Sequence, residues 1–235
     1  MIDFSISERL GLAASFIEKG RVVADIGTDH GYLPIYLIRE GISDKVIAAD
    51  IRKKPLEKAK KNAENFMVSD KIEFRLSDGL ESFSGGEADA YVICGMGGTI
   101  MMKILQKALC DDKLNEGDQL VLSPQADREM FRRFLYEKGF LIEEEKMIRE
   151  NSWFYVVFSC TYDGKPRHES ELIYRYGKKP LEEKQEALKE FLVHERKVLE
   201  RVKEKLDGLG ENVSDSKKKE LLYDLEINKR ALESF

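Results

Sequence analysis

Short apolar runs alternate with helix-like patterns through the first 140 residues of the chain. The runs are rich in β-branched residues, and several are continuously apolar, as in parallel strands covered on both faces. The expected strands are residues 22–26, 46–50, 72–76, 90–94 and 119–123. The expected helices between them are residues 33–40, 56–66, 99–109 and 128–138. This alternation predicts βαβ units and a doubly wound, Rossmann-like α/β fold with a parallel sheet.

The alternation ends after the fifth expected strand. Two further strands are expected at residues 140–148 and 153–161, separated only by residues 149–152. So short a link allows an antiparallel hairpin but no parallel crossover. Five parallel strands and a terminal hairpin are typical of the class I methyltransferase sheet, whereas a dinucleotide dehydrogenase would more often continue with βα units.

The composition changes in the last third of the chain. Residues 163–180 are rich in Gly, Pro and charge, which is typical of a linker. Residues 181–206 are dense in Glu, Lys and Leu, and Leu192, Leu199 and Leu206 recur every seven residues. This pattern predicts one long amphipathic helix with a coiled-coil-like stripe.

A second C-terminal helix is expected after a Gly-rich turn. Gly208, Gly210 and Asn212 interrupt the first helix, and Ser214 is placed to cap the second. Its expected apolar face consists of Leu221, Leu222, Leu225 and Leu232. We therefore expect two domains: residues 1–164, and a linker with an antiparallel helical hairpin at residues 165–235.

Composition narrows the class of protein. With 42% hydrophobic and 35% charged residues and no apolar run long enough for a membrane span, the chain suits a soluble globular protein. The N-terminus does not resemble a secretory signal. The net charge of −5 gives no support for nucleic-acid binding, although a local basic face can still bind phosphates. Three widely spaced cysteines argue against a disulfide framework and fit a reducing cytoplasm: Cys94, Cys110 and Cys160.

The strongest motif lies where the first expected strand ends, in the sequence Asp-Ile-Gly-Thr-Asp-His-Gly at residues 25–31. A dinucleotide site would place uncharged residues around its pyrophosphate, whereas Asp25 and Asp29 would repel one. The two carboxylates suit S-adenosylmethionine, which has no phosphate and carries an ammonium and a sulfonium. The alternative is an ordinary strand-to-helix turn with solvated acids.

The other expected strands also end in polar or glycine-rich motifs. Asp50, which ends the second strand, is placed to accept hydrogen bonds from ribose hydroxyls. Asp78 in Ser-Asp-Gly can accept one from an adenine amino group, with an ordinary turn acid as the equal alternative. The Cys-Gly-Met-Gly-Gly sequence at residues 94–98 either provides a surface with few side chains against which a nucleotide base can lie, or is a flexible loop. Gln125 in Ser-Pro-Gln either bonds a base edge or caps a helix.

Several chemistries are disfavoured by what the sequence lacks. Cys94 is more typical of a small buried hydrophobic residue than of a nucleophile, and no Pro-Cys pair for cytosine-5 methylation is present. The Asp/Asn-Pro-Pro-Tyr loop that orients an exocyclic amine is also missing. The histidines lie too far apart in the sequence to indicate a metal site: His30, His168 and His194.

Residues 25–34, 94–98 and 123–125 together resemble the bacterial tRNA (adenine(22)-N(1))-methyltransferase family. Residues 7–10 are similar to that family's N-terminal helix, and the order of a catalytic domain and a charged helical hairpin also matches. The resemblance implies methyl transfer from S-adenosyl-L-methionine to N1 of adenine 22 in tRNA. The residues expected to bind the cofactor are Asp25, Gly27, Thr28, His30, Gly31, Asp50, Ile51, Asp78, Gly79, Gly95 and Met96.

Adenine N1 carries no proton, so its methylation requires positioning and a favourable field more than a base. We expect Asp29 as an acidic partner for the base and His30 as a positioning donor. The residues expected to bind the substrate are Arg9, Gly97, Pro124 and Gln125. Further basic contacts are expected from the cluster that begins at Arg52 and from the helical hairpin. The expected partner is tRNA, with no metal and no membrane, for a cytoplasmic monomer or weak dimer. The alternatives are methylation of another RNA, a protein or a small molecule, and a non-catalytic binding module.

Overall fold

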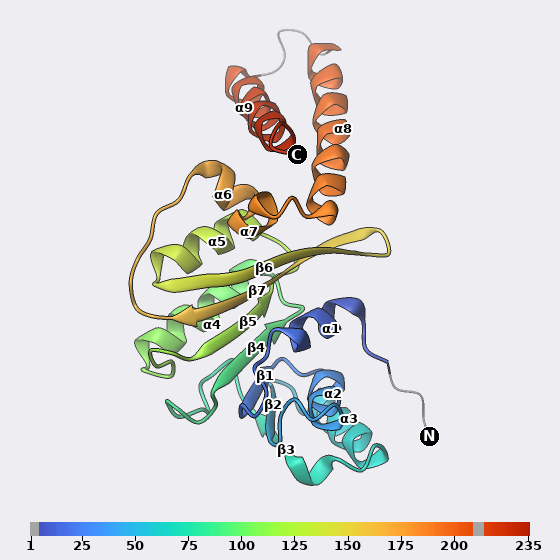
Figure 1. Ribbon diagram of the computed structural model, residues 1–235, viewed down its shortest axis with the longest axis vertical. Coiled ribbons are helices and arrows are strands. Elements are labelled where there is room, and N and C mark those ends of the chain that lie inside the picture. The colour runs from blue at the N-terminus through green and yellow to red at the C-terminus, as the bar shows by residue number, and fades with distance from the viewer. Residues whose placement is uncertain (1–4, 209–213) are drawn as a thin grey trace. The chain divides into compact units, whose positions relative to one another are not determined.

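In the computed structural model, which describes residues 5–208 and 214–235, seven strands form one sheet in the order β3-β2-β1-β4-β5-β7-β6 (Figure 1). The strands are β1 (Val23–Ile26), β2 (Val46–Asp50), β3 (Ile72–Leu76), β4 (Ala90–Cys94), β5 (Gln119–Ser123), β6 (Phe140–Glu150) and β7 (Trp153–Tyr162). The first five are parallel, and β7 runs antiparallel to β5. The expected fold class, a parallel α/β sheet with a terminal hairpin, is confirmed.

The strand register brings the carboxyl ends of the central strands to one edge. Ile26 at the end of β1 pairs with Ala49 of β2 and with Ile93 of β4. Every residue of β1, β2 and β5 is buried, which explains why these strands read as continuous apolar runs. The loops that leave these strands therefore start side by side, where sheets of this kind bind ligands.

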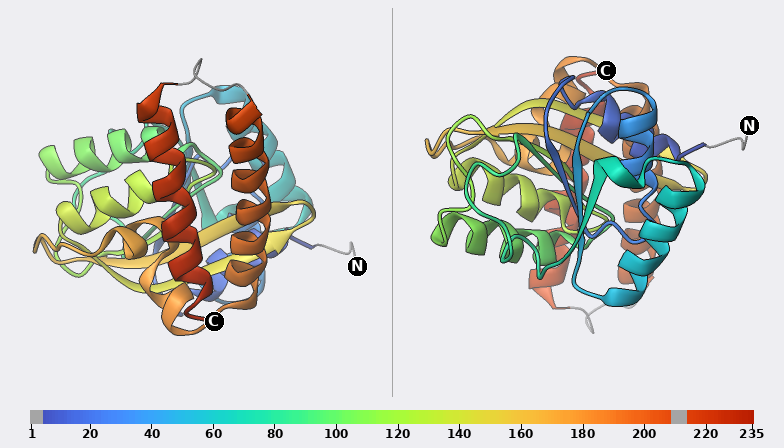
Figure 2. Two further views of the ribbon diagram at one scale, coloured as in Figure 1. Left: turned by 90° about the horizontal axis from the view of Figure 1, so that it is seen from above. Right: turned by 90° about the horizontal axis from the view of Figure 1, so that it is seen from below.

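Helices cover both faces of the sheet. On one face lie α1 (Glu8–Ser15), α2 (Tyr32–Arg39) and α3 (Lys53–Asn65), and on the other lie α4 (Gly98–Cys110) and α5 (Arg128–Glu137) (Figure 2). A 3-10 turn, η1 (Ser69–Lys71), precedes β3. The core of the first face joins Ala13 and Ala14 of α1 to Leu33 of α2 and Ala63 of α3, against strand residues such as Val92. Helix α1 begins at a Ser7 side chain that accepts a hydrogen bond from the Leu10 amide at 3.3 Å.

The chain divides into two compact units. The sheet unit contains the described residues up to Glu145 together with Tyr155–His168, and the helical unit contains Lys146–Phe154 and the described residues from Glu169 onward. The end of the β6–β7 hairpin, where only Asn151 and Ser152 separate the strands, therefore groups with the helical segments. The expected division after residue 164 assigns the hairpin end to the first domain. In the structure the hairpin end groups with the helical segments, which are near it in space but not in sequence.

Two expectations for the helical unit were wrong. The segment interpreted as a linker contains α6 (Glu171–Tyr176) and α7 (Lys178–Glu182), and it buries Tyr174 and Tyr176. Residues 181–206 do not form one helix, because Lys184 adopts φ +51° and α8 (Glu186–Gly208) begins only after it. The content of Gly, Pro and charged residues hid these short helices from the sequence analysis, although α6 buries both of its tyrosines.

Helices α8 and α9 (Asp215–Leu232) lie side by side as an antiparallel pair (Figure 2). Asn228 Nδ2 donates to the carbonyl oxygen of Leu192 at 3.1 Å, while Arg196 Nη1 donates to that of Leu225 at 3.3 Å. The buried residues of the two helices are Leu188, Leu192, Leu221, Ile227, Asn228 and Ala231. Leu222, expected in that face, is 55% exposed, because it lies one residue past the buried Leu221.

Gly208 is the last residue of α8, and Ser214 is the N-cap residue of α9. Gly210 and Asn212, expected in the turn, lie outside the described residues. Within residues 5–208 and 214–235, no helix combines the length and the apolar character that crossing a bilayer requires.

Candidate active site

The sheet unit contains a cavity of about 530 Å³ at the carboxyl ends of its strands. Its walls come from the loops after β1, β2, β3, β4 and β5 and from helices α1, α2 and α4. Of the residues expected to form the site, the lining contains Arg9, Asp25, Gly27, Thr28, Asp29, His30, Asp50, Ile51, Asp78, Gly79, Gly95, Met96 and Gln125. The five strand-end motifs of the sequence therefore each contribute to one cavity.

Three of the expected site residues lie outside this lining. Gly31 precedes α2 with φ +72°, and a Cβ there would lie 2.9 Å from the Cβ of Ala59, so its role is close helix packing. Gly97 is the N-cap residue of α4, and Pro124 is buried after β5. The motif pattern could not separate glycines that face the cavity from glycines that pack behind it.

The lining also includes residues that were not among the expected site residues. Ile100 and Ile104 lie one turn apart on α4, and together with Leu10 they make part of the wall apolar. Their spacing of four residues on the helix after the glycine run was the available signal. The other added residues are Ile26, Tyr32, Leu33, Arg52, Ser77 and Cys94.

The loop after β1 is held in an unusual backbone conformation. Gly27 has φ +84° and Asp29 has φ +46°. The amides of Gly27 and Thr28 both donate to the carbonyl oxygen of Ala49, at 2.8 and 3.0 Å, which ties the loop to the end of β2. A Cβ at position 27 would lie 2.3 Å from the Met96 methyl group, so a side chain there would enter the space between the β1 and β4 loops.

Two buried carboxylates make the cavity electronegative. Asp25 is 5% exposed and Asp50 is 6% exposed. Burial raises the pKa of Asp25 to about 7, and the negative charge of Asp50 acts in the same direction. Asp50 accepts a hydrogen bond from the Arg52 amide at 2.8 Å. A cationic ligand would stabilise the charged form of both acids.

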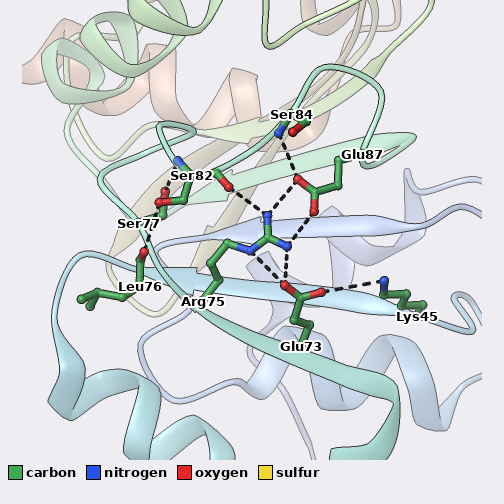
Figure 3. Close-up of polar contacts among 8 residues, drawn as sticks. All are labelled: Lys45, Glu73, Arg75, Leu76, Ser77, Ser82, Ser84 and Glu87. Carbon is green, nitrogen blue, oxygen red and sulfur yellow. Dashed lines mark hydrogen bonds and ion pairs between the residues drawn. The ribbon is translucent and has the colours of Figure 1, made fainter.

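The loop that carries Asp78 is braced by a polar network (Figure 3). The Ser77 hydroxyl donates to the carbonyl oxygen of Gly79 at 2.9 Å and accepts from the Ser82 amide at 3.1 Å. Arg75 donates to the carbonyl oxygen of Ser82 at 3.1 Å and pairs with Glu87. This pairing holds the pKa of Glu87 at about 2. The network fixes the position of Asp78 without using its carboxylate.

At the mouth of the cavity, His30 and Asp29 are more exposed than the buried acids Asp25 and Asp50. His30 Nε2 lies 3.3 Å from Asp29 Oδ2, and the His30 ring stacks on Tyr32 with centroids 5.3 Å apart. The Cys94 thiol lies deeper, where burial raises its pKa to about 12. A thiol with this pKa remains protonated at neutral pH, so the geometry does not provide a cysteine nucleophile.

Comparisons with known proteins agree with this geometry. The family profile described as "Methyltransferase domain" matches residues 6–158. The tRNA (adenine(22)-N(1))-methyltransferase of Bacillus subtilis is 34% identical over 171 residues, covering 70% of this chain and 71% of that protein. The crystal structure of the B. subtilis m1A22 tRNA methyltransferase TrmK matches with a TM-score of 0.86 and 28% identity, covering 98% of this chain and 100% of that one. The M. capricolum TrmK structure, in complex with S-adenosyl-homocysteine, matches with a TM-score of 0.84 and 27% identity over 97% of this chain and 98% of that one.

The sheet order, the strand-end cavity and the matching domain profile define a Rossmann-like methyltransferase. Within the methyltransferases, the sequence match and the structural matches over nearly the whole chain indicate one family. The chain belongs to the tRNA (adenine(22)-N(1))-methyltransferase family.

Proposed function

We propose that this protein transfers a methyl group from S-adenosyl-L-methionine to N1 of adenine 22 in tRNA. The observation that carries the proposal is the meeting of Asp25, Asp50, Asp78 and the glycine loops in one cavity of a family member. The cavity's chemistry fits the cofactor, because its buried acids suit a cation. In addition, the Nη1 atom of Arg9 is buried there without a hydrogen-bond partner among the described residues.

The strand-end acids suit three parts of the cofactor. Asp50, at the end of β2, is assigned to the ribose hydroxyls, and Asp78, after β3, to the adenine amino group. Asp25, at the centre of the sheet edge, is assigned to the amino-acid ammonium. When bound, S-adenosylmethionine supplies an electrophilic methyl group on its sulfonium. Residues 1–164 are accordingly proposed as the catalytic domain.

The protein's own contribution to methyl transfer is positioning. Adenine N1 has a free lone pair and no proton to remove, so no general base is required. Asp29 and His30 at the cavity mouth are proposed to orient the base, together with Gln125, which lines the same cavity from the loop after β5. The carboxylates in the wall favour the positive charge that develops on the base. N1 lies on the Watson–Crick edge, so a paired adenine must first leave its helix.

A second hollow beside the mouth supports RNA binding by the sheet unit. It measures about 480 Å³ and shares Asp29 and Arg52 with the cavity. Its remaining lining is Lys53, Lys54, Pro55 and Lys58. No ion pair involves these three lysines among the described residues, so their charges are available to phosphates next to the target nucleotide. In the helical unit, α9 also exposes Lys217 and Lys219.

The proposal also covers the cellular location and the oligomeric state of the protein. A cytoplasmic location follows from its proposed substrate, tRNA, and fits three cysteines that are free thiols. We propose a monomer or weak dimer, which light scattering across a concentration series would test.

The decisive experiment is incubation of the purified protein with S-adenosylmethionine and unmodified tRNA, followed by mass spectrometry of the nucleosides. We expect 1-methyladenosine, and we expect none from a matched tRNA with guanine at position 22. Methylation that persists in the substituted tRNA would place the target elsewhere. Cofactor binding without tRNA methylation would indicate another substrate, such as another RNA, a protein or a small molecule. Failure to bind the cofactor would favour a binding module.

A further inference from the structure

Two loops at the carboxyl edge of the sheet, one after β4 and one after β5, are joined by backbone hydrogen bonds. The Gly95 amide donates to the carbonyl oxygen of Ser123 at 3.2 Å. Further along, the Gln125 amide donates to the carbonyl oxygen of Met96 at 2.9 Å. These bonds continue the parallel pairing of β4 with β5 past the ends of both strands. Because Gly95, Met96 and Gln125 line the cavity, the joined loops form one continuous piece of its wall.

The two loops also pack closely where α4 begins. A Cβ added to the buried Gly98 would lie 2.6 Å from the Ala126 carbonyl oxygen and 3.1 Å from the Asp127 Cβ. The first distance is shorter than carbon and oxygen tolerate, and the oxygen belongs to the backbone, so no side-chain rotation can relieve the clash. The approach of the loops therefore requires glycine at position 98.

Asp127 connects the β5 loop to α4 through its side chain. It is the N-cap residue of α5, a position where aspartate usually accepts a hydrogen bond from an amide of its own helix. Within the described residues its carboxylate makes no such capping bond, and Oδ2 accepts from the Thr99 hydroxyl of α4 at 2.9 Å instead. Asp127 also has φ +59°, in the left-handed region that favours glycine. An aspartate that adopts this conformation and leaves its own helix uncapped indicates that the contact with α4 has a function.

We propose that Asp127 is a positioning residue for methyl transfer, which acts through Thr99 to fix the part of the wall that carries Gln125. The inference rests on the proposed function, in which Gln125 orients the adenine base. A Cβ at Gly95 would lie 3.8 Å from Gln125 Nε2, so this amide lies against the β4 loop, and a shift between the loops moves it. Misplacement of a reacting group by about 1 Å can lower a rate on the order of 100-fold. The bond between Asp127 and Thr99 therefore affects the chemical step more than the binding of cofactor or tRNA.

The test separates the hydrogen bond from the backbone conformation and from the charge. Asp127→Gly keeps the left-handed conformation but removes the carboxylate, whereas Asp127→Asn removes the charge but keeps an acceptor for Thr99. Steady-state methylation of unmodified tRNA should give a kcat about 3- to 10-fold lower in Asp127→Gly, the range expected for one lost hydrogen bond. Thr99→Val should match this decrease, while Asp127→Asn and Thr99→Ser should retain most of the wild-type kcat. The KM for tRNA and the Kd for S-adenosylmethionine should stay near the wild-type values in all four variants.

Two further variants have matched controls. Asp112→Gly is the control for Asp127→Gly, because Asp112 is also an exposed aspartate with a positive φ of +51°, but it follows the other end of α4, outside the cavity lining. Its kcat should be unchanged. Gly98→Ala should push the loops apart and lower kcat further than Asp127→Gly does. Gly11→Ala, in α1, should not lower it, because a Cβ there would meet nothing within 4 Å.

Hydrogen exchange tests the connection between the loops without tRNA. The Gln125 amide should exchange faster in Asp127→Gly than in Asp127→Asn, because its hydrogen bond crosses to the other loop. Equal exchange and equal kcat in these two variants would overturn the inference. A higher KM for tRNA at unchanged kcat would also overturn it and make Asp127 an RNA contact, and a lower melting temperature at unchanged kcat would leave a role in stability alone. A wild-type protein that does not methylate tRNA would instead contradict the proposed function, while the exchange rates would still show whether Asp127 holds the loops together.

Discussion

The two units of the protein bury polar groups in opposite ways. At the strand-end cavity of the sheet unit, Asp25 and Arg9 are enclosed without oppositely charged partners among the described residues. In the helical unit, Glu195 accepts from the Tyr176 hydroxyl at 2.6 Å and from Asn228 Nδ2 at 2.9 Å, and Arg175 pairs with both Glu195 and Asp224. Buried charges without an opposite charge are costly and indicate a ligand. The connected network instead specifies how the helices pack, with only Asn228 Oδ1 left without a partner among its described side-chain atoms.

The same contrast is visible in the titration of buried groups. The pKa of Asp25 is raised by burial, and the described residues around it offer it no cation. The pKa of Arg175 is raised although its burial acts the other way, because Asp224 and Glu195 stabilise its charge. We propose that a positively charged ligand completes the first arrangement, whereas the second already contains its opposite charges. We therefore expect substitutions in the two units to have different signatures.

The largest effect is expected for Asp25→Asn. Removing the carboxylate should weaken S-adenosylmethionine binding by on the order of 100-fold, because the cavity then lacks a charged hydrogen-bond partner for the cofactor. The melting temperature should stay the same or rise, since the substitution removes a buried charge. Calorimetry and thermal unfolding test both parts, with the exposed Asp70→Asn as the control. Wild-type affinity in a folded variant would remove Asp25 from the site.

Asn228→Ala should show the reverse signature. It deletes two hydrogen bonds and leaves the Leu192 carbonyl and Glu195 short of a donor, so we expect a decrease of about 1–3 kcal/mol in the free energy of unfolding. S-adenosylmethionine affinity at a temperature where the variant is folded should be unchanged. Chemical denaturation and calorimetry provide the two measurements. A variant with native stability but weaker cofactor binding would contradict the separation of roles.

Charge removal at the second hollow tests whether the sheet unit contacts RNA. Lys54→Gln/Lys58→Gln should weaken tRNA binding and reduce the slope of log affinity against log salt by about one for each phosphate that the variant no longer binds. Lys60→Gln/Lys61→Gln changes the same charge farther along α3, outside the hollow, and serves as the matched control. Cofactor affinity should remain constant in both. Identical salt slopes for the two double variants would remove this hollow from the RNA interface.

The raised pKa of Asp25 predicts pH-dependent cofactor binding. Below about pH 7 the free protein carries Asp25 protonated, so binding a cation must release that proton. Affinity should therefore fall by up to about tenfold for each pH unit below 7 and level off above it. The stability of the free protein should change in the opposite direction, because a carboxyl whose pKa is raised by folding contributes less to the free energy of unfolding as pH rises toward 7. Titration from pH 6 to 8, repeated with Asp25→Asn, tests this; a dependence that survives the substitution has another source.

The smallest effect is expected for Cys94→Ser. With a pKa of about 12 the thiol is protonated at neutral pH, and adenine N1 methylation needs no thiolate. The variant should retain most of the tRNA methylation rate. Trapping a covalent protein–RNA adduct through Cys94 would show a different chemistry.

Local sequence determined the sheet, the α/β alternation and most of the cavity lining. Residues 46–50, 72–76, 90–94 and 119–123 match the observed strands because a strand buried on both faces needs a continuous apolar run. The acids and glycines that end these runs converge because parallel strands share one edge. These motifs alone indicated a site for a cationic cofactor, whereas the family and the tRNA substrate were implied by the resemblance of residues 25–34, 94–98 and 123–125 to a known family.

Tertiary structure decided what depends on neighbours distant in sequence. Gly31 packs against Ala59, while Gly27 faces the cavity, and nothing in the motif distinguishes the two. The break at Lys184 is not visible in the composition, and the residue after it, Gln185, accepts a hydrogen bond at 2.9 Å from the Met147 amide, 38 residues earlier in the chain. Arg9 is an ordinary helix residue until α1 places its guanidinium beside Gly95 and Tyr155, with no acceptor for a buried nitrogen among the described residues. Burial and partner satisfaction are properties of the folded chain, because they depend on which distant groups exclude water from a given atom.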